Sequence, residues 1–207
     1  MKRGIGWLAM VVMSLLPVFA FAQTVDLKAL VVELKQGGYV IVFRHGATNR
    51  DQADTDPLNF DNIAQQRLLS EKGKEVAKQV GEAFKRLEIP LGRVYTSKFN
   101  RAVETGKLLS GSEVMPILDV TEGGLVVTPI ENDRRAEALK KMAGTTPEAG
   151  KNTLIVTHKP NIVDAFGKDW FEVKEGEASV FKPDASGKAV FVTRVQAVDW
   201  IKAAGTN

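Results

Sequence analysis

The stretch YVIVFRHGATN, residues 39–49, opens with five apolar residues and continues into an arginine, a histidine and a glycine. A continuous apolar run of this length, rich in β-branched residues, is typical of a strand that is covered on both faces. Arg44, His45 and Gly46 then fall where the strand passes into a loop. Because the chain has only two histidines, one of them beside an arginine at a strand end raises the question of a chemical role.

Apolar runs of strand length alternate with segments of helical periodicity along the rest of the chain. The pattern predicts strands at 39–43, 92–97, 113–120 and 152–159, and helices at 25–38, 69–90, 100–111, 132–144 and 161–167. Two last strands, 178–183 and 188–195, flank a turn signal and form a hairpin. We therefore predict an α/β fold, a three-layer α/β/α arrangement with a mostly parallel central sheet and a C-terminal antiparallel hairpin.

Residues 49–66 have a different character from the segments around them. They are polar, include four aspartates and show no period. A loop of this length is usually a functional lid or disordered. We expect it to cap a pocket or to shape substrate choice.

The first 22 residues, MKRGIGWLAMVVMSLLPVFAFA, have the pattern of an export signal. Lys2 and Arg3 precede an uncharged apolar run, and Ala20-Phe21-Ala22 gives a small-x-small cleavage site. We predict cleavage after Ala22, which leaves residues 23–207 as a single domain in the periplasm or outside the cell. The alternative is a retained membrane anchor, because the apolar run approaches the roughly 20 residues that span a bilayer.

Composition excludes several classes of function. Lys2 and Arg3 are the only charged residues of the signal, so its removal lowers the formal net charge from +3 by two. A nearly neutral chain without clustered cations predicts no nucleic-acid partner, and no membrane contact after cleavage. The absence of cysteine excludes thiolate catalysis and cysteine-based zinc sites. Nothing in the sequence bears on the oligomeric state.

Polar side chains follow three of the predicted strands at the point where each strand ends. Arg44 and His45 follow the apolar run YVIVF, Ser97 and then Arg101 follow the run RVY, and His158 follows the run LIV within 152–159. The carboxyl ends of parallel strands share one edge of a sheet, which is where ligands bind in such folds. Each residue alone could be an ordinary strand end, but both histidines hold the same topological position.

Two guanidinium groups and two imidazoles at one edge suit a phosphoryl group, which arginine binds in bidentate fashion. Nearby positive charges disfavour protonation of an imidazole, and a neutral imidazole is a nucleophile. His45, next to Arg44 and Gly46, is the better placed of the two histidines. A leaving alkoxide also needs a proton, so a carboxylic acid should lie nearby.

The motifs FRHGAT, YTSKFNRAVETGKLL and VTHKPNI, in this order and with the segment LSEKGKEVA between the first two, resemble the histidine phosphatase superfamily in its phosphoglycerate-mutase-like branch. The resemblance implies an exported, bacterial-type member in which His45 is phosphorylated. It implies that Arg44, Arg101 and His158 bind the phosphoryl oxygens, and that Glu122, after the third strand, donates the proton. It implies no metal and no cofactor.

The function expected from this resemblance is hydrolysis of a small phosphomonoester through a phosphohistidine, with a sugar phosphate or an envelope glycan phosphate as possible substrates. Glu131 and Asp119 are alternatives to Glu122, and Arg67 is a candidate additional phosphate ligand. Three other functions stay open at this point: a mutase, a metal-dependent phosphoesterase and a phosphate-binding module without activity. The metal-dependent reading would use the histidines with Asp51, Asp54 or Asp164.

Overall fold

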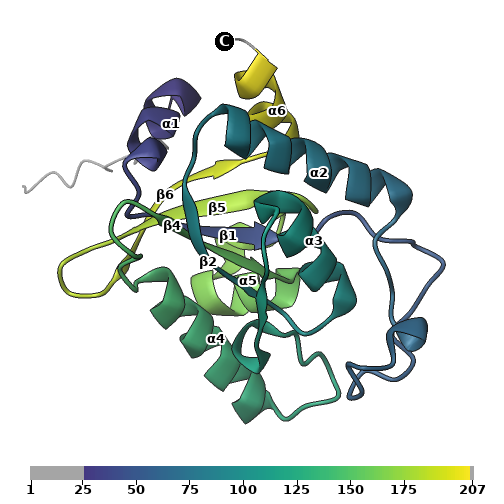
Figure 1. The fold of residues 1–207 in the computed structure, drawn as a ribbon. Coiled ribbons are helices and arrows are strands. Elements are labelled where there is room, and N and C mark those ends of the chain that lie inside the picture. The colour runs from purple at the N-terminus through teal and green to yellow at the C-terminus, as the bar shows by residue number, and fades with distance from the viewer. Residues whose placement is uncertain (1–25, 206–207) are drawn as a thin grey trace, which may run out of the picture.

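The computed structural model describes residues 26–205, so the predicted export signal lies outside the described residues. A single mixed sheet of six strands runs through the molecule in the order β3-β2-β4-β1-β5-β6 (Figure 1). The strands are β1 (Val40–Arg44), β2 (Leu91–Thr96), β3 (Met115–Pro116), β4 (Asn152–Thr157), β5 (Ala178–Pro183) and β6 (Ala189–Val195). The first four are parallel, and β5 and β6 form the antiparallel hairpin. This confirms the predicted fold class.

Helices cover both faces of the sheet (Figure 1). They are α1 (Leu27–Lys35), α2 (Glu71–Arg86), α3 (Asn100–Ser110), α4 (Pro129–Ala143), α5 (Lys159–Phe166) and α6 (Ala197–Gly205). One apolar core joins α1, α2, α3 and α6 to the sheet, and a second joins α4 and α5 to its other face. Consecutive β1 side chains enter the two cores alternately, which is why this strand is apolar throughout.

Strands β1 and β4 bring the two histidine-bearing strand ends together. They pair in parallel, with Arg44 opposite Thr157, so His45 and His158 follow at the same edge of the sheet. The next strand, β2, pairs with the other side of β4 and leads into α3. The sheet edge at which the sequence predicts the two histidines is therefore formed by neighbouring strands.

Local signals at helix ends match the structure. The Asp26 carboxylate accepts the N–H of Lys28 at 3.0 Å, and the Ser70 hydroxyl accepts that of Gly73 at 3.1 Å, so both residues are N-caps. Gly111 ends α3 with a left-handed backbone, φ 64°, as a C-terminal glycine commonly does.

Three elements differ from the sequence expectation. The strand predicted over 113–120 is only two residues, Met115–Pro116, before a 3₁₀ turn at Leu118–Val120, because proline cannot extend an edge ladder. Helix α4 begins at Pro129, three residues earlier than expected, since Thr128 caps it. Helix α6 was not predicted, although its Trp200 is fully buried against the core.

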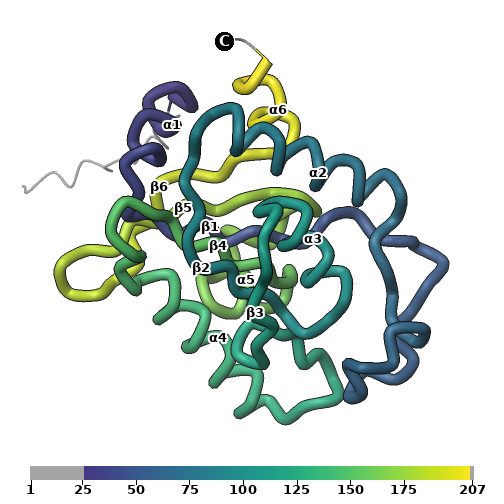
Figure 2. The backbone as a smooth tube through the Cα atoms, in the orientation of Figure 1, coloured from purple at the N-terminus to yellow at the C-terminus, as the bar shows by residue number. Residues whose placement is uncertain are grey.

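The predicted long loop is present and is folded against the molecule. Figure 2 shows it leaving the end of β1 and returning to the start of α2. A β-bridge between Thr48 and Leu69 closes its base, and a 3₁₀ turn covers Ile63–Gln65. None of the helices within residues 26–205 combines the length and the hydropathy that a membrane crossing requires.

Candidate active site

The two histidines meet at the end of the sheet. The ring centroids of His45 and His158 are 5.0 Å apart, with the ring planes inclined by 61°. His45 directly follows β1 and His158 follows β4, so the topology and not a flexible loop sets their separation.

His45 is almost fully buried, and one contact shows which of its two ring nitrogens is unprotonated. Its Nδ1 lies 2.8 Å from the carbonyl oxygen of Gly46. A carbonyl only accepts hydrogen bonds, so Nδ1 carries the proton and Nε2 keeps its lone pair. Burial, and then the charge of Arg101, lower the pKa of His45 to about 3. The ring is therefore neutral and nucleophilic at physiological pH.

The backbone after His45 is held by two helices. The N–H of Gly46 donates to Thr105 Oγ1 at 3.1 Å, and that hydroxyl donates to the carbonyl of Arg101 at 2.7 Å. On the other side, a Cβ at Gly73 would come within 2.0 Å of the Ala47 carbonyl oxygen. Helices α2 and α3 thus fix the turn that carries His45.

His158 presents a hydrogen-bond donor. Its Nε2 is 2.7 Å from the hydroxyl of Ser97, and its Nδ1 is 3.5 Å from Glu122 Oε2. A bare Nδ1 beside a carboxylate would be repelled, so the proton is on Nδ1 and the hydroxyl donates to Nε2. Burial lowers the pKa of His158 well below its usual value, with Arg101 as the next cause. The ring is neutral, and its Nδ1–H has no hydrogen-bond partner.

Arg101 is fully buried and holds two carboxylates. Its Nη1 pairs with Asp54 at 2.9 Å and its Nη2 pairs with Glu122 at 2.8 Å. The guanidinium also lies over the ring of Phe99, with its Cζ 4.2 Å from the centroid. This places a fixed positive charge beside both histidines, which accounts for its effect on their pKa values.

Arg44 directly precedes His45 and ends β1. Its Nη1 donates to the carbonyl of Val173 at 2.7 Å, and its Nη2 is 3.7 Å from Glu175. Burial lowers the pKa of Arg44. Arg67, which sequence reasoning offered as an extra phosphate ligand, lines a cavity together with Arg44, and its charge also acts on His45.

Unsatisfied donors concentrate in this group. Among residues 26–205, seven buried polar side-chain atoms have no hydrogen-bond partner, and three of them are Arg44 Nε, Arg101 Nε and His158 Nδ1. Buried donors are normally paired, so a set of unpaired ones calls for an explanation. An oxyanion bound between these residues would satisfy them, as expected for a phosphoryl group.

The carboxylate beside the histidines is Glu122. Its two oxygens face Arg101 and His158. The alternatives lie elsewhere, because Asp119 and Glu131 both pair with Arg134 on the surface of α4. Of the three acids considered, only Glu122 touches the site. The hydrogen bond from Lys98 N to Thr121 Oγ1, at 2.9 Å, anchors the segment that carries it.

Two residues make contacts in the site that were not predicted from the sequence. Asp54 accepts hydrogen bonds from Arg101 Nη1 and from the backbone N–H of Arg67, both at 2.9 Å. In the sequence it is one of four aspartates in a loop without a period, so nothing singled it out for this contact. Thr105 looked like an ordinary polar position of α3. Its spacing of four residues from Arg101, one helical turn, was the available signal.

The residues proposed for a metal site do not gather. Within the described part of the chain, no three His, Cys, Asp or Glu side chains form a cluster suited to a metal ion. Asp54 pairs with a guanidinium instead.

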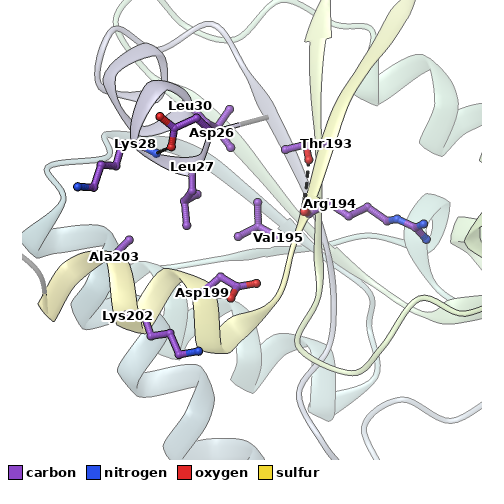
Figure 3. Close-up of a pocket in the computed structure, with 10 residues that line it drawn as sticks. All are labelled: Asp26, Leu27, Lys28, Leu30, Thr193, Arg194, Val195, Asp199, Lys202 and Ala203. Atoms are coloured by element: carbon purple, nitrogen blue, oxygen red, sulfur yellow. Dashed lines mark hydrogen bonds between the residues drawn. The ribbon is translucent and has the colours of Figure 1, made fainter. Parts of the chain in front are cut away.

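A second cavity lies apart from the histidines. Figure 3 shows it between α1, β6 and α6, with Asp26, Lys28 and Asp199 among the residues that line it. Its volume is about 400 Å³. It contains no histidine and none of the site arginines, so it lacks the groups that the chemistry above requires.

The comparisons with known proteins agree with the motifs. Residues 40–122 match the family model described as histidine phosphatase superfamily (branch 1). The match runs from the strand that delivers His45 to the carboxylate at Glu122. It confirms the resemblance predicted from the sequence, a resemblance to branch 1 of the histidine phosphatase superfamily. No curated protein matches the chain.

Solved structures share the fold. A protein histidine phosphatase SixA complexed with tungstate is 18% identical, with 77% of this chain and 97% of that chain covered and a TM-score of 0.54. YhfR from Bacillus stearothermophilus is 18% identical, with 79% and 98% covered and a TM-score of 0.55. A mycobacterial glucosyl-3-phosphoglycerate phosphatase in complex with inorganic phosphate is 16% identical, with 80% and 99% covered and a TM-score of 0.53.

Proposed function

We propose that this protein is an exported phosphomonoesterase that works through a phosphohistidine at His45. The observation that carries the proposal is the free Nε2 of a buried, neutral imidazole in a site where Arg44, Arg101 and His158 each have an unpaired donor. The family match supports the same reading. The proposed substrate is a small phosphorylated molecule, with a sugar phosphate or an envelope glycan phosphate among the candidates.

In the first step, the phosphoryl group binds between the two arginines and His158, and His45 Nε2 attacks phosphorus. The bond from phosphorus to the ester oxygen breaks, and Glu122 gives that oxygen a proton. Two carboxylates already share Arg101. A phosphoryl dianion bound beside them brings a further negative charge to the same guanidinium.

In the second step, water replaces the histidine. Glu122, now ionised, takes a proton from the water, the oxygen attacks phosphorus, and the bond to His45 breaks. Inorganic phosphate leaves, and both side chains regain their first state. The scheme assigns charge neutralisation to the arginines and uses no metal or cofactor; in other phosphoryl-transfer enzymes one well-placed arginine contributes roughly 10³- to 10⁵-fold in rate.

The test uses mature protein and its His45→Ala variant with p-nitrophenyl phosphate and a panel of phosphomonoesters. We expect the wild type to turn over several of them and to yield an acid-labile phosphoprotein on rapid quenching, and we expect the variant to do neither. The wild type should keep its rate after treatment with EDTA. Substantial hydrolysis by the variant, or activity that EDTA removes and added metal restores, would show that the scheme is wrong.

Export is the second part of the proposal, and it depends on the sequence of residues 1–22. Cell fractionation with sequencing of the mature N-terminus tests it. A new terminus at Gln23 in the periplasm or the medium is the expected result, whereas full-length protein in the membrane fraction would favour the retained anchor.

A further inference from the structure

A cavity of about 430 Å³ opens beside Arg44. Its cationic lining consists of Arg44, Arg50, Arg67, Lys159 and Lys174. We refer to it as the Arg44 cavity. Two carboxylates, Glu172 and Glu175, also line it, so the cations exceed the acids.

Most of these cations lack an acidic partner. Within the described part of the chain, Arg44 is the only one of the five with an ion pair, a 3.7 Å contact with Glu175. Elsewhere on the surface, lysines and arginines such as Lys35 and Arg134 pair with carboxylates. The Lys159 ammonium lies 4.8 Å from the centroid of the Phe171 ring. Like charges that converge in excess of their counter-charges attract an anionic ligand.

The Arg44 cavity adjoins the nucleophile. Arg44 immediately precedes His45, and Thr48, three residues further, also lines the cavity. On the side of Arg101 the space is occupied, because Arg101 is fully buried and pairs with Asp54 and Glu122, and α3 holds Gly46. A leaving group attached to the transferred phosphoryl therefore extends toward the Arg44 cavity.

Building on the proposed function, we propose that the Arg44 cavity binds the leaving group and selects phosphomonoesters whose alcohol part carries a second anionic group, a carboxylate or another phosphate. Arg44 and Arg101, with His158, suffice for the transferred phosphoryl group. The cations at Arg50, Lys159 and Lys174 are then available for a second anion. Guanidinium and ammonium groups bind carboxylate and phosphate alike, so the two anions share one chemistry.

The experiment compares substrates matched except for the second anion. Glycerol 3-phosphate and 3-phosphoglycerate form the carboxylate arm, and fructose 6-phosphate and fructose 1,6-bisphosphate form the phosphate arm, with p-nitrophenyl phosphate as the reference. We expect kcat/KM to be about tenfold higher for the anionic member of at least one pair at low salt. The ratio should shrink toward one in about 0.5 M NaCl, because salt screens partly exposed charges.

The variant Arg50→Gln/Lys174→Gln tests where this preference arises. We expect it to lower the ratio within a pair, whereas Lys141→Gln, an exposed lysine on α4, should leave the ratio unchanged. Equal kcat/KM within both pairs, with p-nitrophenyl phosphate turned over, would overturn the inference and leave the phosphatase proposal intact. The inference would also be overturned if the double variant kept the preference for the substrate with the second anion. Failure of wild-type protein to hydrolyse any phosphomonoester would overturn both.

Discussion

Glu122 has two neighbours that give its two oxygens different tasks. One oxygen accepts a hydrogen bond from Arg101 Nη2 at 2.8 Å, and the other faces His158 Nδ1 at 3.5 Å. The carboxylate is therefore held in place by the same guanidinium that would bind the phosphoryl group. A fifth of the Glu122 side chain is exposed to solvent. The carboxylate can therefore exchange a proton with water.

Glu122→Gln should therefore lower the rate in a way that depends on the leaving group. For an alkyl phosphate, whose alkoxide needs a proton, we expect kcat to fall about 10²- to 10⁴-fold. For p-nitrophenyl phosphate, whose phenolate leaves without help, the fall in the phosphorylation step should be much smaller. Single-turnover measurements of the two substrates check this. Equal losses for both leaving groups would mean that Glu122 acts by holding Arg101 and not as the acid.

Asp54 places a negative charge where the phosphoryl group would bind. It pairs with Arg101 Nη1 and is mostly buried, with 16% of its side chain exposed. A dianion that approaches the same guanidinium is repelled by this carboxylate. We therefore expect Asp54 to weaken phosphate binding while it orients Arg101.

Asp54→Asn should tighten the binding of inorganic phosphate roughly 3- to 10-fold, because removal of one like charge at this range is worth about 1 kcal/mol. The measurement is the inhibition constant of phosphate against p-nitrophenyl phosphate hydrolysis. Asp56→Asn is the matched control, since Asp56 lies in the same loop and accepts a hydrogen bond from Asn62 instead. Weaker phosphate binding in Asp54→Asn would mean that the carboxylate only positions Arg101 and does not repel the phosphate.

At the scale of elements, the contact between α2 and the turn after His45 links stability to catalysis. Gly73 lies in the first turn of α2, and the carbonyl oxygen of Ala47 occupies the space that a Cβ would need. The backbone of the same turn donates from Gly46 to α3. A side chain at Gly73 therefore displaces the turn that orients His45, the proposed nucleophile.

Gly73→Ala should lower the free energy of unfolding by about 1–3 kcal/mol, as overpacking usually does. It should also reduce kcat, since the Gly46 carbonyl that fixes the His45 tautomer moves. Gly81→Ala is the control, because its Cβ would come within 2.2 Å of the Leu108 carbonyl oxygen, in the packing of α2 on α3. We expect a comparable loss of stability there with kcat retained. A normal kcat in folded Gly73→Ala protein would contradict this coupling.

The elements that deliver the site were predictable for a physical reason. Strands β1 and β4 are buried on both faces, so their sequences are continuous apolar runs, and the polar residues that follow mark their ends. Parallel pairing then places those ends together. His45, Arg101 and His158 could be brought to one edge by this argument alone.

Other parts of the site had no such signal. Asp54 reaches Arg101 through a loop whose path depends on tertiary contacts, such as the acceptance of the Asn100 N–H by the Gln66 side chain at 2.8 Å. The length of β3 also depends on tertiary contact, and Pro116 limits its hydrogen-bonded ladder to two residues. The turns and the edge strands were thus less predictable from the sequence than the central strands.

At the scale of the whole molecule, two buried neutral histidines make stability depend on pH. Burial, then the positive charge of Arg101, lowers the pKa of His45 from 6.5 to about 3, and the pKa of His158 falls in the same direction for the same reasons. In the unfolded chain both side chains titrate near pH 6.5. Below that pH the unfolded chain binds more protons than the folded one, so acid favours unfolding.

The contribution of the neutral histidines to the free energy of unfolding is fully present above about pH 6.5, and it is lost as the pH falls from there toward 3. Its slope approaches about 1.4 kcal/mol per pH unit for each histidine. His45→Gln removes one of the two groups, so between about pH 5 and 6 its free energy of unfolding should fall less steeply than that of the wild type by about this amount. Urea denaturation in phosphate-free buffer measures both slopes, since bound phosphate would stabilise the folded state. Parallel slopes would mean that His45 titrates normally in the folded protein, and the neutral nucleophile would lose its support.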